Sequence, residues 1–356
     1  MPIDYQKKLA ELMVLAAQQG ASDLHLSVGK HPTVRIDGNL IPVSNEPILT
    51  PEMTAGLISV LLTPEQEEKL LKERELDFAF SYEDKIRFRI NVYFQKGYLS
   101  AALRLIPTHI RTIEELNLPP VLHEFSKYNQ GFILVVGPAG HGKTTTLAAI
   151  VDEINHKRMD HIITIEDPIE YTFTQDRALI DQREVGSDTL SFHRGLKSVL
   201  RQDPDVVMIG EMRDPESISI ALTAAETGHL VLSTLHTNSS SQTIDRIIDS
   251  FPANQQNQVR AQLASTLIGI VSQRLVPRIA GGRIPACEIM FANSAVKNLI
   301  REGKNYQIDL VIDTSVQEGM SSLNRSLIDL VRRREISLEV AEAYSLNPTE
   351  LRQLVG

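Results

Sequence analysis

A glycine-rich stretch followed by a lysine and a threonine has the clearest chemical meaning in this sequence. Residues 137–144 read Gly-Pro-Ala-Gly-His-Gly-Lys-Thr, which fits the phosphate-loop pattern G-x-x-x-x-G-K-[ST]. Glycines let successive backbone N–H groups turn inward around an anion, Lys143 can reach the β- and γ-phosphates, and Thr144 can ligate Mg²⁺. We therefore expect ATP and Mg²⁺ as cofactors. The residues expected to bind them are Gly137, Pro138, Ala139, Gly140, His141, Gly142, Lys143, Thr144 and Thr145.

Two later segments place carboxylates directly after short apolar runs. The run at 161–166 leads into Glu166, Asp167 and Glu170, where a phosphate-loop enzyme would keep a metal-linked or water-activating acid. The run at 205–209 leads through Gly210 to Glu211, like a Walker B strand with glycine in the usual aspartate position. We expect Glu211 to serve the magnesium ion through water, because Mg²⁺ keeps several of its waters. The alternative in both places is an ordinary acidic strand–loop junction.

Two histidines bracket another apolar run, and we expect them at the two ends of one strand. They are His229 and His236, seven positions apart. A metal site is disfavoured because no cysteine or third histidine supports one. Hydrogen bonding to phosphate or to a catalytic glutamate is favoured, and satisfied structural histidines are the alternative.

The elements that must position these residues change character along the chain. Residues 1–106 contain a helix at 5–19, a hairpin at 33–43 with its turn at Asp37-Gly38, and three further alternating runs, which predict an antiparallel α+β domain. Prolines 107, 119 and 120 frame a linker. Apolar runs at 131–136, 161–166, 205–209 and 229–235 then alternate with helical segments, which predicts a mostly parallel sheet with its site at the carboxyl ends of the strands. From about 253 onward we expect mainly helix.

Composition narrows the class of protein. The chain has 356 residues, enough for at least two domains, and a net charge of −9, which disfavours a protein that coats nucleic acid. Its single cysteine, Cys287, rules out an internal disulfide framework and a multi-cysteine zinc site. No apolar run reaches the ~18 residues needed to cross a bilayer, so we expect a cytoplasmic protein without a transmembrane segment.

Four segments in a fixed order resemble the secretion ATPase superfamily, and within it the retraction ATPases of type IV pili. They are the phosphate loop, Ile165–Tyr171, Gly210–Asp214 and Thr223–His229. The resemblance begins at Ala21–Leu26, reaches Val296–Glu302 and weakens after about residue 330.

The resemblance implies roles for individual residues. Glu170 matches the general base that activates water, and Glu211 matches an atypical Walker B acid that usually follows glycine. The histidines match the family's His box, and two arginines of the first domain match those offered to the nucleotide like arginine fingers; exposed strand arginines are the alternative. The implied catalytic residues are Glu170, Glu211, His229, His236, Arg89 and Arg104. Ala139 and His141 replace the family's usual Thr and Ser, so nucleotide affinity could differ here.

The resemblance also implies an architecture and partners. It implies a PAS-like N-terminal domain at 1–106, a linker at 107–120, a RecA-like ATPase core at 121–290 and a helical C-terminal region at 291–356. The implied assembly is a homo-hexamer, peripheral at the inner face of the cytoplasmic membrane. The hexamer would act on an inner-membrane pilus platform protein and use ATP hydrolysis to draw pilin subunits out of the pilus. A paralogous pilus ATPase is a further possible partner, and no binding of nucleic acid is expected.

Four alternatives remain at this point. An accessory retraction ATPase fits the same motifs. Extension and type II secretion ATPases usually carry an extra N-terminal domain and a four-cysteine metal loop, which one cysteine cannot build. A RecA-like nucleic-acid motor would bind DNA or RNA in a salt-sensitive way through a basic face. A non-enzymatic scaffold would not need acids placed like Glu170 and Glu211.

Overall fold

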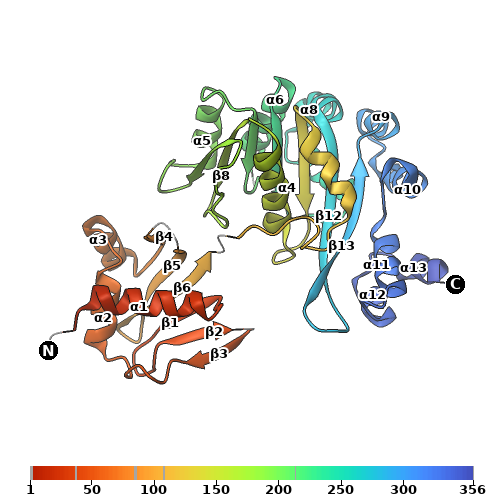
Figure 1. The fold of residues 1–356 in the computed structure, drawn as a ribbon. Helices are drawn as coiled ribbons and strands as arrows, with labels where there is room; N and C mark the ends of the chain where they lie inside the picture. Colours follow the sequence, from red (N-terminus) through yellow and green to blue (C-terminus); the bar gives the residue numbers. More distant parts are fainter. Residues whose placement is uncertain (1–2, 37, 84–85, 107–108, 213, 356) are drawn as a thin grey trace. The chain divides into compact units, whose positions relative to one another are not determined.

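The chain divides into two compact units (Figure 1). One unit is Met1–His109 with Glu170–Thr172, and the other is Ile110–Ile169 with Phe173–Gly356. The structure is a computed structural model and describes residues 3–36, 38–83, 86–106, 109–212 and 214–355. Four residues of the expected segments lie outside the described residues: Asp37 of the hairpin turn, Lys85 at the start of the alternating run at 85–93, Pro107 of the linker, and Arg213 of the segment at 210–214.

The first unit contains a six-stranded antiparallel sheet in the order β3-β2-β1-β6-β5-β4, as expected from its alternating runs. Its strands are β1 (Asp23–Leu26), β2 (Thr33–Ile36), β3 (Asn39–Pro42), β4 (Glu75–Tyr82), β5 (Ile86–Gln95) and β6 (Tyr98–Ile106). Its helices are α1 (Tyr5–Gln18), α2 (Pro51–Ser59) and α3 (Pro64–Glu73).

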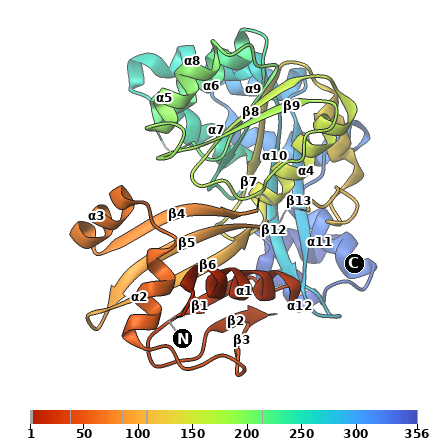
Figure 2. The ribbon, with the colours of Figure 1, turned by 60° about the vertical axis from the view of Figure 1, so that its left-hand side comes forward.

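One face of this sheet is apolar and the other is polar. Helices α1 and α2 pack together over β1 and β6 (Figure 2), and the core between them includes Leu12, Leu24 and Leu103. The helix starts follow from local sequence, because Thr50 and Thr63 each cap a helix whose first residue is proline. Thr63 and Gln66 form a full capping box.

The second unit contains a seven-stranded, mostly parallel sheet in the order β13-β12-β7-β11-β10-β8-β9. Its strands are β7 (Gly131–Val136), β8 (His161–Glu166), β9 (Leu179–Glu184), β10 (Val206–Ile209), β11 (Leu230–Leu235), β12 (Leu267–Pro277) and β13 (Arg283–Phe291). Only β12 and β13 pair antiparallel among the strands of this described sheet.

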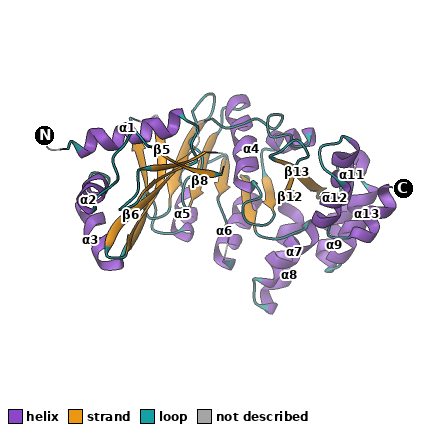
Figure 3. Cartoon of the chain, turned by 90° about the horizontal axis from the view of Figure 1, so that it is seen from below, coloured by secondary structure: helices purple, strands orange, loops and turns teal. Residues whose placement is uncertain are grey.

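Helices cover both faces of this sheet. Helix α4 (Lys143–Lys157) lies on one side, and α5 (Phe192–Val199), α6 (Pro215–Glu226), α7 (Ser240–Asp249) and α8 (Ala253–Thr266) lie on the other (Figure 3). The 3-10 helix η1 (Pro120–Lys127) packs on α4. The remaining helices are α9 (Ser294–Glu302), η2 (Asn305–Gln307), α10 (Ile308–Thr314), η3 (Val316–Glu318), α11 (Leu323–Arg332), α12 (Leu338–Tyr344) and α13 (Pro348–Val355).

The region after residue 253 is mainly helical, as expected, but two strands that were not expected, β12 and β13, follow α8. Short apolar runs do not distinguish a buried helix from a buried strand by periodicity alone. Gly269 is the overlooked signal: a Cβ there would come within 2.6 Å of the Met290 carbonyl oxygen on β13. Such close backbone approach is a usual reason for glycine inside a strand. Strand β9 was also missed, since its sequence is largely polar.

Within the described residues, no helix combines the length and the apolar character that crossing a membrane requires.

Candidate nucleotide site

The phosphate loop joins the fully buried strand β7 to helix α4. Gly140 and Gly142 adopt left-handed backbone angles, with φ of 75° and 79°, and Gly142 caps the helix. Such angles aim N–H groups into a concave anion site, and the positive end of the helix dipole adds to it. Thr144 and Thr145 lie in the first turn of α4. The residues present therefore fit a triphosphate and its Mg²⁺.

Three neighbouring strands bring Lys143, His236 and Glu211 into one chain of contacts. Lys143 is 7% exposed, and its Nζ donates to the Pro138 carbonyl oxygen at 3.0 Å. The same Nζ lies 3.3 Å from Nδ1 of His236, whose Nε2 lies 3.3 Å from a carboxylate oxygen of Glu211. A neutral imidazole with its proton on Nε2 satisfies both contacts. The histidine thus connects the lysine expected to bind phosphate with the acid expected to serve the magnesium ion.

The Glu211 segment is fixed by backbone contacts at the end of β10. The Gly210 N–H donates to the Ile165 carbonyl oxygen at 2.8 Å, and the Thr234 hydroxyl donates to the Gly210 carbonyl oxygen at 2.6 Å. Glu211 itself is partly exposed. It therefore lies at the carboxyl edge of the sheet, where the sequence pattern placed it.

The two candidate bases, Glu166 and Glu170, have different surroundings. Glu166 ends β8 and is 3% exposed, and one of its carboxylate oxygens accepts from the Thr164 hydroxyl at 2.7 Å and from the Gln182 amide at 3.1 Å. Glu170 is exposed and groups with the first unit. A buried carboxylate held by two donors suits a structural role, whereas an exposed one can approach water. The role of Glu170 stays a prediction.

Arg89 and Arg104 are brought together within the first unit. They lie directly opposite each other on β5 and β6, on the polar face of the sheet. Arg104 Nε donates to a carboxylate oxygen of Asp23 at 2.9 Å, while Arg89 Nε lies 3.9 Å from a carboxylate oxygen of Asp77. Burial alone would raise the pKa of Asp23, but hydrogen bonds from Ser22 and Arg104 lower it overall. No local pattern in the sequence indicates that Asp23 is the partner of Arg104, since the two residues lie 81 positions apart.

His229 is not brought to the lysine–histidine–glutamate chain. It precedes β11 at the opposite edge of the sheet, where its carbonyl oxygen accepts from the Gly131 N–H. Its Nδ1 lies 2.9 Å from the Ala224 carbonyl oxygen. The two histidines do occupy the two ends of one strand, as expected, and that strand separates them by roughly 20 Å.

Gln273, which the sequence analysis also did not identify, contacts the phosphate loop from β12. It is buried, and its amide nitrogen donates to the His141 carbonyl oxygen. Beside it, a cavity of about 260 Å³ is lined by Thr145 and Arg111, among others. The apolar, β-branched run at 267–271 could have identified β12 as a strand, but not the direction of this side chain.

Comparison with known proteins gives consistent relatives over nearly the whole chain. The family described as "Type II/IV secretion system protein" matches residues 4–307. The type IV pilus retraction ATPase PilT of Pseudomonas aeruginosa is 44% identical over 340 residues, covering 96% of this chain and 98% of that protein. The type IV pilus ATPase PilU of the same organism is 38% identical, covering 98% of this chain and 91% of that protein.

A solved structure of the pilus retraction motor PilT with bound ADP has a TM-score of 0.90 to this chain. The two are 45% identical in sequence, and the match covers 96% of this chain and 98% of that one. This similarity includes both units described above, so the expected fold class, an N-terminal α+β domain followed by a RecA-like ATPase domain, is confirmed.

Proposed function

The chain belongs to the type II/IV secretion system protein family and is an ATPase, and we propose that it is the motor that powers retraction of type IV pili. The observation that carries this proposal is the contact chain from Lys143 through His236 to Glu211 beside a phosphate loop. Similarity to the PilT retraction ATPase over 96% of the chain supports retraction as the mechanical task of this site.

We propose the following roles in hydrolysis. The loop N–H groups and Lys143 bind the phosphates of ATP, and the rest of the nucleotide extends toward the cavity beside Thr145. Thr144 and, through water, Glu211 would hold Mg²⁺, which would offset the negative charge of the phosphates when it is bound. His236 keeps Glu211 and Lys143 in fixed positions, and Glu170 accepts a proton from the attacking water.

Arg89 and Arg104 complete the site in this proposal by stabilising charge on the transferring phosphoryl group. Their place opposite each other on β5 and β6 lets them act as one cationic face. Arg104 must exchange its Asp23 partner for phosphate, so nucleotide competes with an ion pair already made. That exchange would couple the state of the nucleotide to movement of the first unit, because ATP and ADP make different contacts.

The working assembly in this proposal is a homo-hexamer at the inner face of the cytoplasmic membrane. It acts on an inner-membrane pilus platform protein and draws pilin subunits out of the pilus, which produces twitching motility. A ring is supported by the location of Arg89 and Arg104 in a different compact unit from the phosphate loop, since assembly can hold such separate parts together.

An accessory retraction role, like that of a second pilus ATPase, is the second candidate, because the chain is 38% identical to PilU over nearly its full length, against 44% to PilT. Deleting the gene separates the roles. Excess surface pili with lost twitching indicates the main retraction motor, and loss of pili indicates extension. Retained twitching with reduced force indicates the accessory role. Complementation with Lys143→Ala shows whether hydrolysis by this chain is required.

A further inference from the structure

Strand β12 extends beyond its neighbour β7, and the phosphate loop takes the place that β7 leaves. The parallel ladder between the two strands ends at Ser272 opposite Val136, whereas β12 continues to Pro277. On its other side β12 remains paired with β13 along this whole stretch. The edge of β12 beyond Ser272 therefore faces the loop, with side chains and backbone groups available to it.

One side chain on this edge holds two parts of the nucleotide site at once. Gln273 is 2% exposed. Its Nε2 donates to the His141 carbonyl oxygen at 2.8 Å, and its Oε1 accepts from the Thr146 hydroxyl at 2.7 Å. The first contact reaches the loop and the second reaches the first turn of α4. Because both ends of the amide are used, its orientation is fixed.

Two more contacts follow the same edge. The Leu275 N–H donates to Nδ1 of His141 at 2.9 Å, so the His141 ring continues the ladder that β7 no longer supplies. A Cβ on Gly137 would lie 2.3 Å from the Gln273 carbonyl oxygen, which only a missing side chain permits. The backbone of β12 thus lies directly against the start of the loop, and its side chain and N–H groups hold the loop's middle.

We propose that Gln273 is a positioning residue that sets the phosphate loop in its anion-binding shape from the neighbouring strand. This inference rests on the ATPase activity of the proposed function. Gln273 acts through the His141 carbonyl group and Thr146, not through phosphate. A preorganised cradle binds ATP and ADP more tightly than a loop that must first be ordered. Loss of Gln273 should therefore weaken both nucleotides and raise KM more than it lowers kcat.

The test uses the full chain and measures ADP dissociation constants with a fluorescent ADP analogue, together with Tm and steady-state kinetics. In Gln273→Leu, ADP affinity should fall about tenfold, as expected when a buried hydrogen-bond pair that orders the loop is lost. Gln273→Glu keeps an acceptor for Thr146 but loses the donor to His141, so it should weaken ADP as well.

A matched control is the buried amide at the far end of the same helix. Asn155 is 0% exposed, and its Nδ2 donates to the Thr174 carbonyl oxygen while its Oδ1 accepts from the Asp176 N–H. Asn155→Leu should lower Tm and leave ADP affinity unchanged. Equal loss of affinity in Asn155→Leu and Gln273→Leu would mean that general destabilisation explains both, and would overturn the proposal.

A double variant separates positioning from stability. Thr146→Val in the Gln273→Leu background replaces both partners of the buried contact by apolar groups, which should restore much of the lost Tm. ADP affinity should stay low, because the His141 carbonyl contact is still missing. Recovery of affinity together with Tm would overturn the proposal. If the wild-type chain neither binds ADP nor hydrolyses ATP, the proposed function fails instead, which is a distinct outcome.

Discussion

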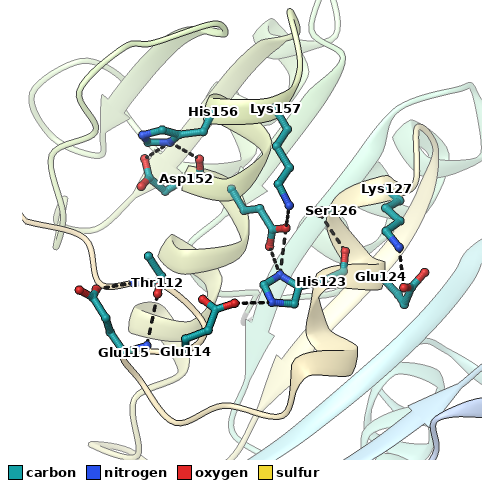
Figure 4. A network of polar contacts seen from close by, with 11 residues as sticks. Thr112, Glu114, Glu115, His123, Glu124, Ser126, Lys127, Asp152, His156 and Lys157 are labelled. Atoms are coloured by element: carbon teal, nitrogen blue, oxygen red, sulfur yellow. Dashed lines mark hydrogen bonds and ion pairs between the residues drawn. The ribbon is translucent and has the colours of Figure 1, made fainter.

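The two ends of helix α4 differ in how their charged side chains are paired. At the first end, Lys143 contacts a loop carbonyl and His236, beside glycines with left-handed angles. At the last end, Glu153 accepts from both His123 and Lys157, and His123 also contacts Glu114 (Figure 4). One end gathers cationic groups and N–H donors around a place for an anion. The other end pairs opposite charges and joins α4 to η1.

The pKa values of two histidines, one near each end of α4, shift in opposite directions. Hydrogen bonding to Glu153 raises the pKa of His123, against the effect of burial, and Glu114 adds to the rise. Burial lowers the pKa of His141 in the phosphate loop, and the positive charges of Arg274, Arg283 and Lys143 lower it further. The surroundings of one helix therefore favour protonation of the histidine at one end and disfavour it at the other. This contrast fits the predicted phosphate site at the first end of α4 and the charged pairs that join α4 to η1 at the last end.

Removing the lysine at the first end should have the largest effect. Lys143→Ala loses the charge-assisted contacts to the phosphates, so ATPase activity should fall by about 10³-fold or more. The fold should be retained because the loop lies at the edge of the sheet. Phosphate release and circular dichroism measure the two properties. Lys157→Ala is the matched control at the last end, and it should keep its turnover; wild-type turnover in Lys143→Ala would end the phosphate-loop interpretation.

The second prediction separates binding from hydrolysis at the same site. Glu170→Gln keeps the volume of the side chain and removes the proton acceptor, so it should bind Mg-ATP normally and hydrolyse it about 10²-fold or more slowly. Glu166→Gln belongs in the same assay because that buried carboxylate is the alternative base. If only Glu166→Gln stops hydrolysis, the general base is Glu166 and not Glu170. Equal loss of nucleotide affinity in Glu170→Gln would instead indicate a metal-binding or structural acid.

The third prediction tests whether the nucleotide site at the first end of α4 needs Arg104 of the other compact unit. Arg104→Ala should lower turnover far more than nucleotide binding, if the arginine acts mainly on the charged transition state. An arginine finger contributes about 10³-fold in other phosphate-loop enzymes, so we expect a loss of roughly 10- to 10³-fold. Asp23→Asn frees Arg104 of its ion pair and should leave hydrolysis intact. Activity should also fall on dilution if a ring is required, and full activity of a dilute monomer would argue against both assignments.

Much of this fold follows from local patterns in the sequence. Alternating runs identified the antiparallel sheet of the first unit, and continuous apolar runs identified β7, β8, β10 and β11. Strands β12 and β13 were missed because a sequence of apolar residues there is compatible with helix or strand. Their pairing depends on contacts distant in the sequence, such as Gly269 against Met290, which no local window contains.

The same division applies to the site. Residue type and position after a strand were enough to place Lys143, His236 and Glu211 at one edge, where they do meet. The partners that hold Arg104 and the phosphate loop were not foreseen: Asp23 lies 81 positions from Arg104, and Gln273 lies 132 positions from His141. Hydrogen bonds of this kind are set by sheet order and register, so a single sequence carries little direct signal for them. The catalytic roles of Glu170, Arg89 and Arg104 remain predictions.

The smallest effects should appear in how stability responds to pH, and they should have opposite signs at the two ends of α4. Because the pKa of His123 is raised in the folded chain, its contribution to the stability of the fold is complete below about pH 6.5. That contribution is lost as pH rises through the folded-state pKa. Because the pKa of His141 is lowered, the opposite holds for this residue. Its contribution to stability is complete above about pH 6.5 and is lost as pH falls through the folded-state pKa.

Thermal melts of the wild-type chain, His123→Gln and His141→Ser between pH 5 and 8.5 measure both contributions. The Tm difference between wild type and His123→Gln should be a few degrees at low pH, as expected for a partly exposed ion pair worth about 1 kcal/mol, and should shrink as pH rises. The difference between wild type and His141→Ser should grow with pH, because only the neutral ring accepts from the Leu275 N–H. Serine keeps the backbone carbonyl group that Gln273 contacts, so the variant isolates the ring. Two slopes of the same sign would show that the ends of α4 do not differ in the electrostatic way described, and that the loop histidine is held by packing alone.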